Sequence, residues 1–128
     1  MSWVSGKFSR GAFAATVLSV IVPAAPAVAQ GAFNGMWSVL IVTEQGPCDR
    51  AYRYPVRLAD GRVLYAGQAD FNVSGHVARN GIVRVTVSRG RQQASGSGRL
   101  VGRGGGGTWR GVGSAGACSG TWTAEKRG

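Results

Sequence analysis

The sequence predicts an all-β protein: a small antiparallel up-and-down barrel of about eight strands, preceded by a signal peptide. Apolar and polar residues alternate over several short segments, which is the pattern of half-buried strands. Tight-turn signals such as Asp60-Gly61 and Asn80-Gly81 separate these segments, and no stretch after residue 29 has helical periodicity. A β-sandwich is the alternative architecture for the same strands.

The first 29 residues have the order of a secretory signal peptide. Lys7 and Arg10 give a basic start, residues 11–22 form an apolar run of 12 residues, and Ala27-Val28-Ala29 offers small side chains for cleavage. The apolar run is too short to span a bilayer comfortably. Residues 30–128 are therefore expected to form a single periplasmic or secreted barrel domain, with no membrane span after cleavage.

The expected domain is strongly basic. Thirteen of the 15 basic residues and all five acidic residues follow residue 29, which gives this part of the chain a net charge of +8. An exported chain rarely meets nucleic acid, so nucleic-acid binding is not expected. An anionic envelope component or an acidic protein is a better candidate partner, although a soluble, self-repelling surface would also explain the charge.

The N-terminal part of the domain is expected to hold three strands. Residues 36–42 are expected to form the first strand, which is apolar on both faces, and residues 44–50 a loop. The next two strands flank Asp60-Gly61. A two-residue type I′ turn at these positions pairs Leu58 with Val63 and keeps the apolar side chains on one face.

Residues 71–90 are expected to form a central hairpin around Asn80-Gly81. A three-residue loop that ends in a left-handed Gly81 pairs Val77 with Val83. A two-residue turn would place polar side chains on the valine face instead. Because a one-residue slip exchanges the two faces of a strand, the three-residue loop is favoured.

The C-terminal part is rich in glycine. Pairing Val85 with Ala94 keeps the inward face of the next strand consistent. Residues 102–107 are expected to be a flexible turn, Trp109 to lie in a short strand, and residues 111–116 to be a loop.

Two cysteines in an oxidising compartment predict one disulfide, between Cys48 and Cys118. Cys48 lies shortly after the first strand and Cys118 just before the last strand, which is expected over residues 120–126. In a closed meander these two points are neighbours, so the disulfide would lock the seam. It would close a loop of about 70 residues, which corresponds to roughly 4 kcal/mol in the chain-entropy model.

The motif Gly-x-Trp occurs three times, and its first copy, Gly35-Met36-Trp37, opens the first strand. This opening resembles that of lipocalin and avidin-type barrels. The pattern from FNGMWSV through CDRAYRYPV and GSGRL to CSGTWTAEKR also resembles a group of short, uncharacterised exported proteins of alphaproteobacteria. Neither resemblance assigns a binding residue or an activity. A structural role for the motif, in which tryptophan fills the barrel end, is favoured.

The inward face of the expected barrel could hold a small apolar ligand. Small side chains remove bulk from one wall, and either a pocket remains there or Trp109 or Trp122 fills the space; close packing of native interiors favours filling. The candidate interior residues are Trp37, Tyr54, Tyr65, Phe71, Ala94, Gly96, Gly98, Trp109 and Trp122.

Arginines provide the candidate anion-binding surface, because guanidinium groups match carboxylate, sulfate and phosphate. The outward-facing candidates are Arg53, Arg57, Arg84 and Arg99. His76, the only histidine, is expected on the outer face. No metal-ligand spacing, cofactor motif or catalytic constellation is recognisable.

These features predict a non-enzymatic exported binding protein. The leading hypothesis is that an arginine-rich surface contacts an anionic envelope component or protein. One alternative is a small-molecule carrier that uses the barrel interior. A second alternative is a secreted protein inhibitor that acts through the loop carrying Cys48.

Overall fold

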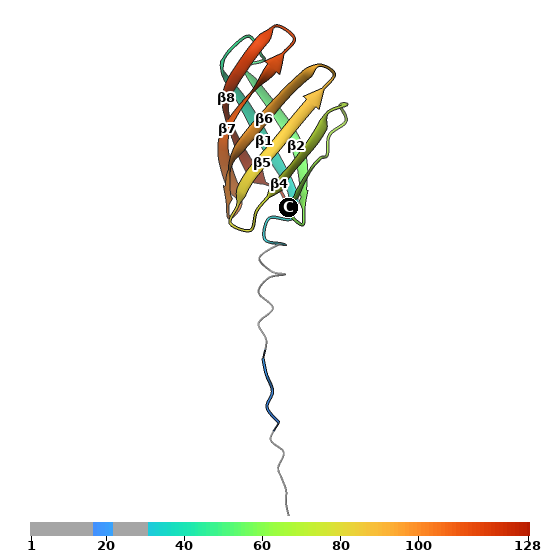
Figure 1. Cartoon of the computed structure of the whole chain (residues 1–128), viewed down its shortest axis with the longest axis vertical. Coiled ribbons are helices and arrows are strands. Elements are labelled where there is room, and N and C mark those ends of the chain that lie inside the picture. Colours follow the sequence, from blue (N-terminus) through green and yellow to red (C-terminus); the bar gives the residue numbers. More distant parts are fainter. Residues whose placement is uncertain (1–16, 22–30) are drawn as a thin grey trace, which may run out of the picture.

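Residues 35–126 form one closed barrel of antiparallel strands (Figure 1). The computed structural model describes residues 17–21 and 31–128 of the chain. The predicted signal peptide lies outside the described residues except for residues 17–21, which are exposed and have no regular secondary structure. No helix in the described ranges is long and apolar enough to cross a membrane.

The strands follow one another around the barrel in chain order, and β1 pairs with β8 to close it. They are β1 (Gly35–Gln45), β2 (Ala51–Ala59), β3 (Arg62–Tyr65), β4 (Asn72–Val77), β5 (Ile82–Arg89), β6 (Gln92–Val101), β7 (Gly104–Gly113) and β8 (Gly116–Lys126). The predicted fold class, an up-and-down barrel of eight strands, is confirmed.

The two predicted hairpin registers are confirmed. Leu58 faces Val63 across the Asp60-Gly61 turn, and Val77 faces Val83 across the Asn80-Gly81 turn. Gly81 has a φ of 91°, a left-handed conformation that side chains disfavour. The valines of both hairpins therefore point into the barrel, as period-two alternation requires.

The predicted register between β5 and β6 is wrong by two residues. Val85 pairs with Gly96 rather than with Ala94, because the chain reverses tightly at Gly90-Arg91 and Arg89 pairs directly with Gln92. A shift of two residues preserves the face of every side chain. The prediction of which residues point inward therefore survives the error.

The glycine-rich C-terminal segments are strands rather than loops. The predicted turn at residues 102–107 is limited to Gly102-Arg103, and the predicted loop at residues 111–116 is limited to Ser114-Ala115. Trp109 lies in a strand of ten residues. Glycines have no side chain that could show alternation, and here hydrogen bonds to the two neighbouring strands hold the backbone extended.

β1 also runs further than predicted, into the expected loop at residues 44–50, with a bulge near its end.

Trp37 plugs one end of the barrel. The side chain is 1% exposed, and its indole Nε1 donates a hydrogen bond to the Phe33 carbonyl oxygen at 2.9 Å. Leu58, Val63 and Leu100 are buried around it. The C-terminus lies at the same end (Figure 1), where the Met36 amide donates to the Gly128 carbonyl at 3.0 Å.

A disulfide joins Cys48 to Cys118, as predicted, with the two Cα atoms 6.1 Å apart. Cys48 lies in the β1–β2 loop, and Cys118 lies within β8 rather than before it. Since β1 and β8 are the strands that close the barrel, the bond fixes the loop beside the seam. The seam prediction is therefore confirmed, at the end of the barrel opposite Trp37.

Candidate functional site

The barrel encloses a cavity of about 440 Å³ between the Trp37 plug and the opposite end. The cavity wall is mostly apolar and comes from the inward faces of all eight strands. The cavity is lined by aliphatic and aromatic side chains, among them Val39, Ile41, Val73, Val77, Val83, Val85, Trp109 and Trp122. The loops that carry Cys48 and Ala115 line its outer part, so this end of the barrel is the mouth.

An aromatic cluster forms one side of the mouth. Tyr52 and Tyr54 stack with ring centroids 5.0 Å apart, and Phe71 meets the Tyr54 ring edge-on at 5.1 Å. Tyr52 is 38% exposed, whereas Tyr54 and Phe71 are half-buried. A ligand that enters here would meet ring faces and edges before it reaches the apolar floor.

The Tyr54 phenol is electrostatically perturbed. Burial raises the pKa of Tyr54 to about 12, and the neighbouring Tyr52 and Tyr65 hydroxyls add to the rise. The Arg89 guanidinium opposes that rise in pKa. The positive charge of Arg89 therefore acts on the Tyr54 hydroxyl in the cavity wall.

Among the residues that the structure describes, Arg89 is the one basic side chain in the cavity lining, and Asp49 is the only other charged residue there. It follows Val83, Val85 and Val87 on the inward face of β5 and ends the strand at the mouth. The guanidinium carbon lies 5.2 Å from the centroid of the Phe71 ring. Arg89 is not among the site residues predicted from the sequence, although the alternation of the valines, continued by two residues, indicates its inward position.

Arg89 is also paired to a carboxylate. Its Nε lies 2.9 Å from Oδ1 of Asp70, which belongs to the β3–β4 loop. The two side chains are 49% and 82% exposed, so the pair lies in solvent at the rim. Exposed pairs of this kind contribute little to stability, and a ligand could exchange with the Asp70 carboxylate at small cost.

The second and third Gly-x-Trp motifs pair with each other in β7 and β8. Gly107 faces Trp122, and Trp109 faces Gly120. The Trp122 indole Nε1 donates to the Ser97 carbonyl oxygen at 3.1 Å, and the Trp109 indole Nε1 donates to the Val42 carbonyl at 3.0 Å. Each tryptophan therefore reaches past the glycine of the facing strand to the strand beyond.

This arrangement makes the tryptophans apolar walls. Their N–H groups are already bonded to backbone carbonyls, so a ligand need not supply acceptors deep in the barrel. The repeated motif therefore has a structural role, as the sequence favoured. The glycine in each copy leaves room for the tryptophan side chain of the other copy to pass.

Most of the predicted interior residues line the cavity. Seven of the nine do so, namely Trp37, Tyr54, Phe71, Ala94, Gly96, Trp109 and Trp122. Tyr65 instead packs behind Phe71, with ring centroids 5.5 Å apart. At Gly98 the space is filled, because an added Cβ would lie 2.6 Å from the Trp122 ring. Trp122 therefore fills the space at Gly98, as close packing predicts, while a pocket remains beside Ala94 and Gly96.

Three of the four predicted anion-binding arginines lie along one belt on the outer face. Arg62 of β3 faces His76, and His76 faces Arg84. Arg57 and Arg99 extend this row at its two ends, as diagonal neighbours of Arg62 and Arg84 respectively. Sequence reasoning missed Arg62, because only the strand order shows that it continues the row.

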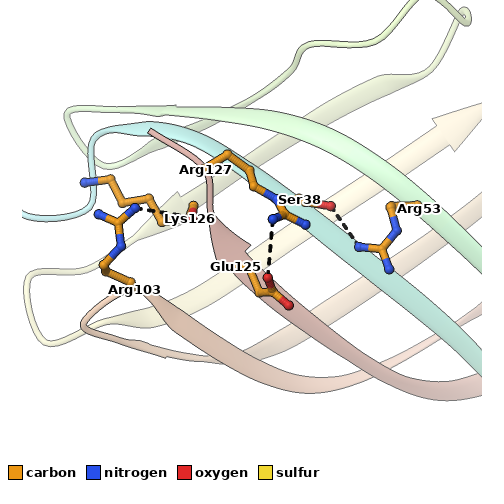
Figure 2. A network of polar contacts seen from close by, with 6 residues as sticks. All are labelled: Ser38, Arg53, Arg103, Glu125, Lys126 and Arg127. Atoms are coloured by element: carbon orange, nitrogen blue, oxygen red, sulfur yellow. Dashed lines mark hydrogen bonds and ion pairs between the residues drawn. The ribbon is translucent and has the colours of Figure 1, made fainter.

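Arg53 lies apart from this belt, on the face shared by β1, β2 and β8 (Figure 2). There its Nη1 donates to the Ser38 hydroxyl at 3.0 Å. Arg127 forms an ion pair with Glu125 at 3.6 Å on the same face. Both arginines thus already have partners, and Arg53 does not join the other three candidates.

Within residues 17–21 and 31–128, no group of three or more His, Cys, Asp or Glu side chains is placed to hold a metal ion. His76 is exposed on the outer face, as its alternation predicts. The cavity is thus a mostly apolar chamber with the Arg89 guanidinium at its rim. No protein-family model, no curated protein and no solved structure matches this chain.

Proposed function

We propose that this protein is a non-enzymatic carrier that binds a small, largely apolar molecule inside its barrel. The observation that supports this most directly is the cavity of about 440 Å³, which is open at one end and plugged by Trp37 at the other. That volume falls within the range of about 300–1,000 Å³ that small-molecule sites occupy. The resemblance of the Gly35-Met36-Trp37 opening to lipocalin and avidin-type barrels points the same way.

The cavity is built to persist without a ligand. Most of its wall consists of strands of a closed sheet, and the disulfide ties the Cys48 loop, which lines the mouth, to β8. A preformed site requires little ordering when the ligand binds, which favours affinity. A disulfide is also most stable in an oxidising compartment, and this supports a periplasmic or secreted location.

N-phenylnaphthylamine, a neutral fluorescent probe of apolar sites, tests the carrier function. We expect it to bind one site per chain and to become brighter. Ala94→Phe should fill the cavity and weaken this binding at least about tenfold. Ser97→Phe is the matched control, because Ser97 lies on the outer face of the same strand. Equal binding by both variants, or no binding by the wild type, contradicts the carrier function.

A second candidate function, contact with an anionic envelope component, is supported by the belt of Arg57, Arg62, His76, Arg84 and Arg99. None of the cross-strand partners of these residues is a carboxylate. Arginine forks arranged in such a row suit sulfate, phosphate or carboxylate groups on a polymer. The inhibitor alternative remains a prediction that no specific feature of the Cys48 loop favours.

Salt titration of binding to a purified anionic envelope glycan tests the belt. The double variant Arg62→Gln/Arg84→Gln should weaken binding and flatten its salt dependence. Arg110 is exposed on β7, where it pairs with Ser95 and Ser119 rather than with the belt. Arg53→Gln/Arg110→Gln therefore removes the same charge from positions off the belt and should have a smaller effect. Equal losses in the two variants would mean that net charge alone attracts the glycan.

A further inference from the structure

The cavity has a polarity gradient along its length. Its floor at Trp37, Leu58 and Val63 is apolar, and the indole donors in its walls are bonded to backbone carbonyls. In the described part of the chain, the charged residues that line the cavity are Arg89 and Asp49, both at the mouth. A ligand that fills this space should itself be apolar at one end and polar at the other.

Arg89 is positioned to receive the polar end. It lies on the inward face of β5, against the Phe71 ring at 5.2 Å, so its guanidinium is held over the opening. Its side chain is 49% exposed, which leaves donors accessible beyond the Asp70 bond. A guanidinium has five N–H donors and binds carboxylates in bidentate geometry.

The other charges at the mouth do not cancel this preference. Asp49 is followed by Arg50 in the β1–β2 loop, and Arg91 lies in the β5–β6 turn. Asp70 is already paired with Arg89. An anion that replaces the Asp70 carboxylate would gain the same contact and in addition bury its apolar body in the barrel.

We infer that the ligand is an amphipathic acid whose apolar body occupies the barrel and whose acidic group binds Arg89 at the mouth in place of Asp70. The inference rests on the proposed carrier function and specifies its ligand class. It goes beyond an apolar cavity because it predicts a head-group preference, an orientation and the residue responsible.

Three competitors with the same tail test the inference: decanoate, decanol and decylamine. Each is titrated against bound N-phenylnaphthylamine at neutral pH and below its critical micelle concentration. Decanoate should displace the probe at the lowest concentration. Arg89→Gln should weaken decanoate about three- to tenfold, the effect of losing one charge-assisted contact at a partly exposed site, and leave decanol unchanged.

Two further variants separate the contact from general charge. Arg91→Gln removes the same charge two residues away, outside the cavity lining, and should leave decanoate binding nearly unchanged. Asp70→Asn removes the competing carboxylate and should strengthen decanoate binding without affecting decanol.

The outcomes distinguish the two proposals. If the three competitors displace the probe equally, or decylamine is the strongest, the cavity binds apolar molecules but the acidic head group is wrong. If Arg89→Gln and Arg91→Gln weaken decanoate to the same extent, Arg89 is not the contact. If neither the probe nor any competitor binds, the carrier function itself fails, and the inference fails with it.

Discussion

Trp122 depends on a glycine in the neighbouring strand. A Cβ added at Gly107 would collide with the Ser97 carbonyl oxygen, to which the Trp122 indole donates its hydrogen bond, and would lie 2.6 Å from the Gly98 Cα atom. The β6 backbone at Ser97 and Gly98 would have to move. The spacing Gly-x-Trp therefore reflects close approach between strands as well as the bulk of tryptophan.

Gly107→Ala should accordingly destabilise the barrel, by about 1–3 kcal/mol as overpacking typically does. Gly104→Ala is the matched control in the same strand, because its Cβ would have as its nearest neighbour the Ala124 carbonyl, at an ordinary 3.6 Å. Urea unfolding followed by tryptophan fluorescence measures both. Equal stability of the two variants would contradict the role assigned to Gly107.

Tyr54 should make the stability of the fold depend on pH in the alkaline range. Burial raises the pKa of Tyr54 in the folded chain to about 12 from its ordinary value of 10.0. The folded state therefore holds this proton more tightly than the unfolded state. The contribution to stability is fully present below pH 10 and is lost as the pH rises through 12.

Unfolding free energies measured between pH 9 and 12 on the wild type and on Tyr54→Phe test this at about half-unit steps. The wild type should lose stability more steeply than the variant across this window. Parallel curves would show that Tyr54 ionises in the folded chain as it does in the unfolded one.

At the level of strands and turns, alternation predicted the hairpins well and the glycine-rich segments poorly. The valines of β4 and β5 could face one another in only one register that kept them on one side. β7 begins with four glycines and therefore offers no such pattern. Its ten residues are strand because β6 and β8 bond to it on both sides.

The turns also differ in how closely the next strand approaches. Gly81 has a φ of 91°, and a Cβ there would collide with the Leu100 carbonyl oxygen of β6. Gly90 is also left-handed, with a φ of 59°, but an added Cβ would have nothing within 4 Å. Of these two turns, only the one at Gly81 adds a steric demand to the left-handed conformation.

Gly81→Ala should therefore cost more than Gly90→Ala. We expect about 1–2 kcal/mol for Gly90→Ala from the left-handed conformation alone, and more for Gly81→Ala because a collision is added. Thermal unfolding of both variants gives the comparison. A larger loss at Gly90 would mean that the approach of Leu100 is not limiting.

At the scale of the whole molecule, the sequence was sufficient to predict the closed barrel and its disulfide seam. The position of Cys48 after the first strand and of Cys118 near the last indicated that the two ends of the sheet meet. The cavity was harder to predict, because its volume depends on how far Trp109 and Trp122 extend across their neighbours. The role of Arg89 depends in turn on the mouth that these side chains leave open.

The disulfide should carry a large share of the stability of so small a domain. Replacing both cysteines, in the variant Cys48→Ser/Cys118→Ser, should lower the free energy of unfolding by about 2–5 kcal/mol. Urea unfolding of the variant and of the oxidised wild type measures the loss. A loss well below about 1 kcal/mol would show that the strand ladders alone close the barrel.

We expect a small amphipathic molecule to bind inside the barrel, and its contacts with the inward-facing side chains test this expectation. Intermolecular nuclear Overhauser effects between decanoate and isotope-labelled protein would report those contacts atom by atom. We predict contacts from the tail methyl group to the Val83 methyl groups and the Trp122 indole, with a shift of the Arg89 side-chain resonances. Contacts confined to the outer face of the barrel, or no contacts at saturating ligand, would contradict it.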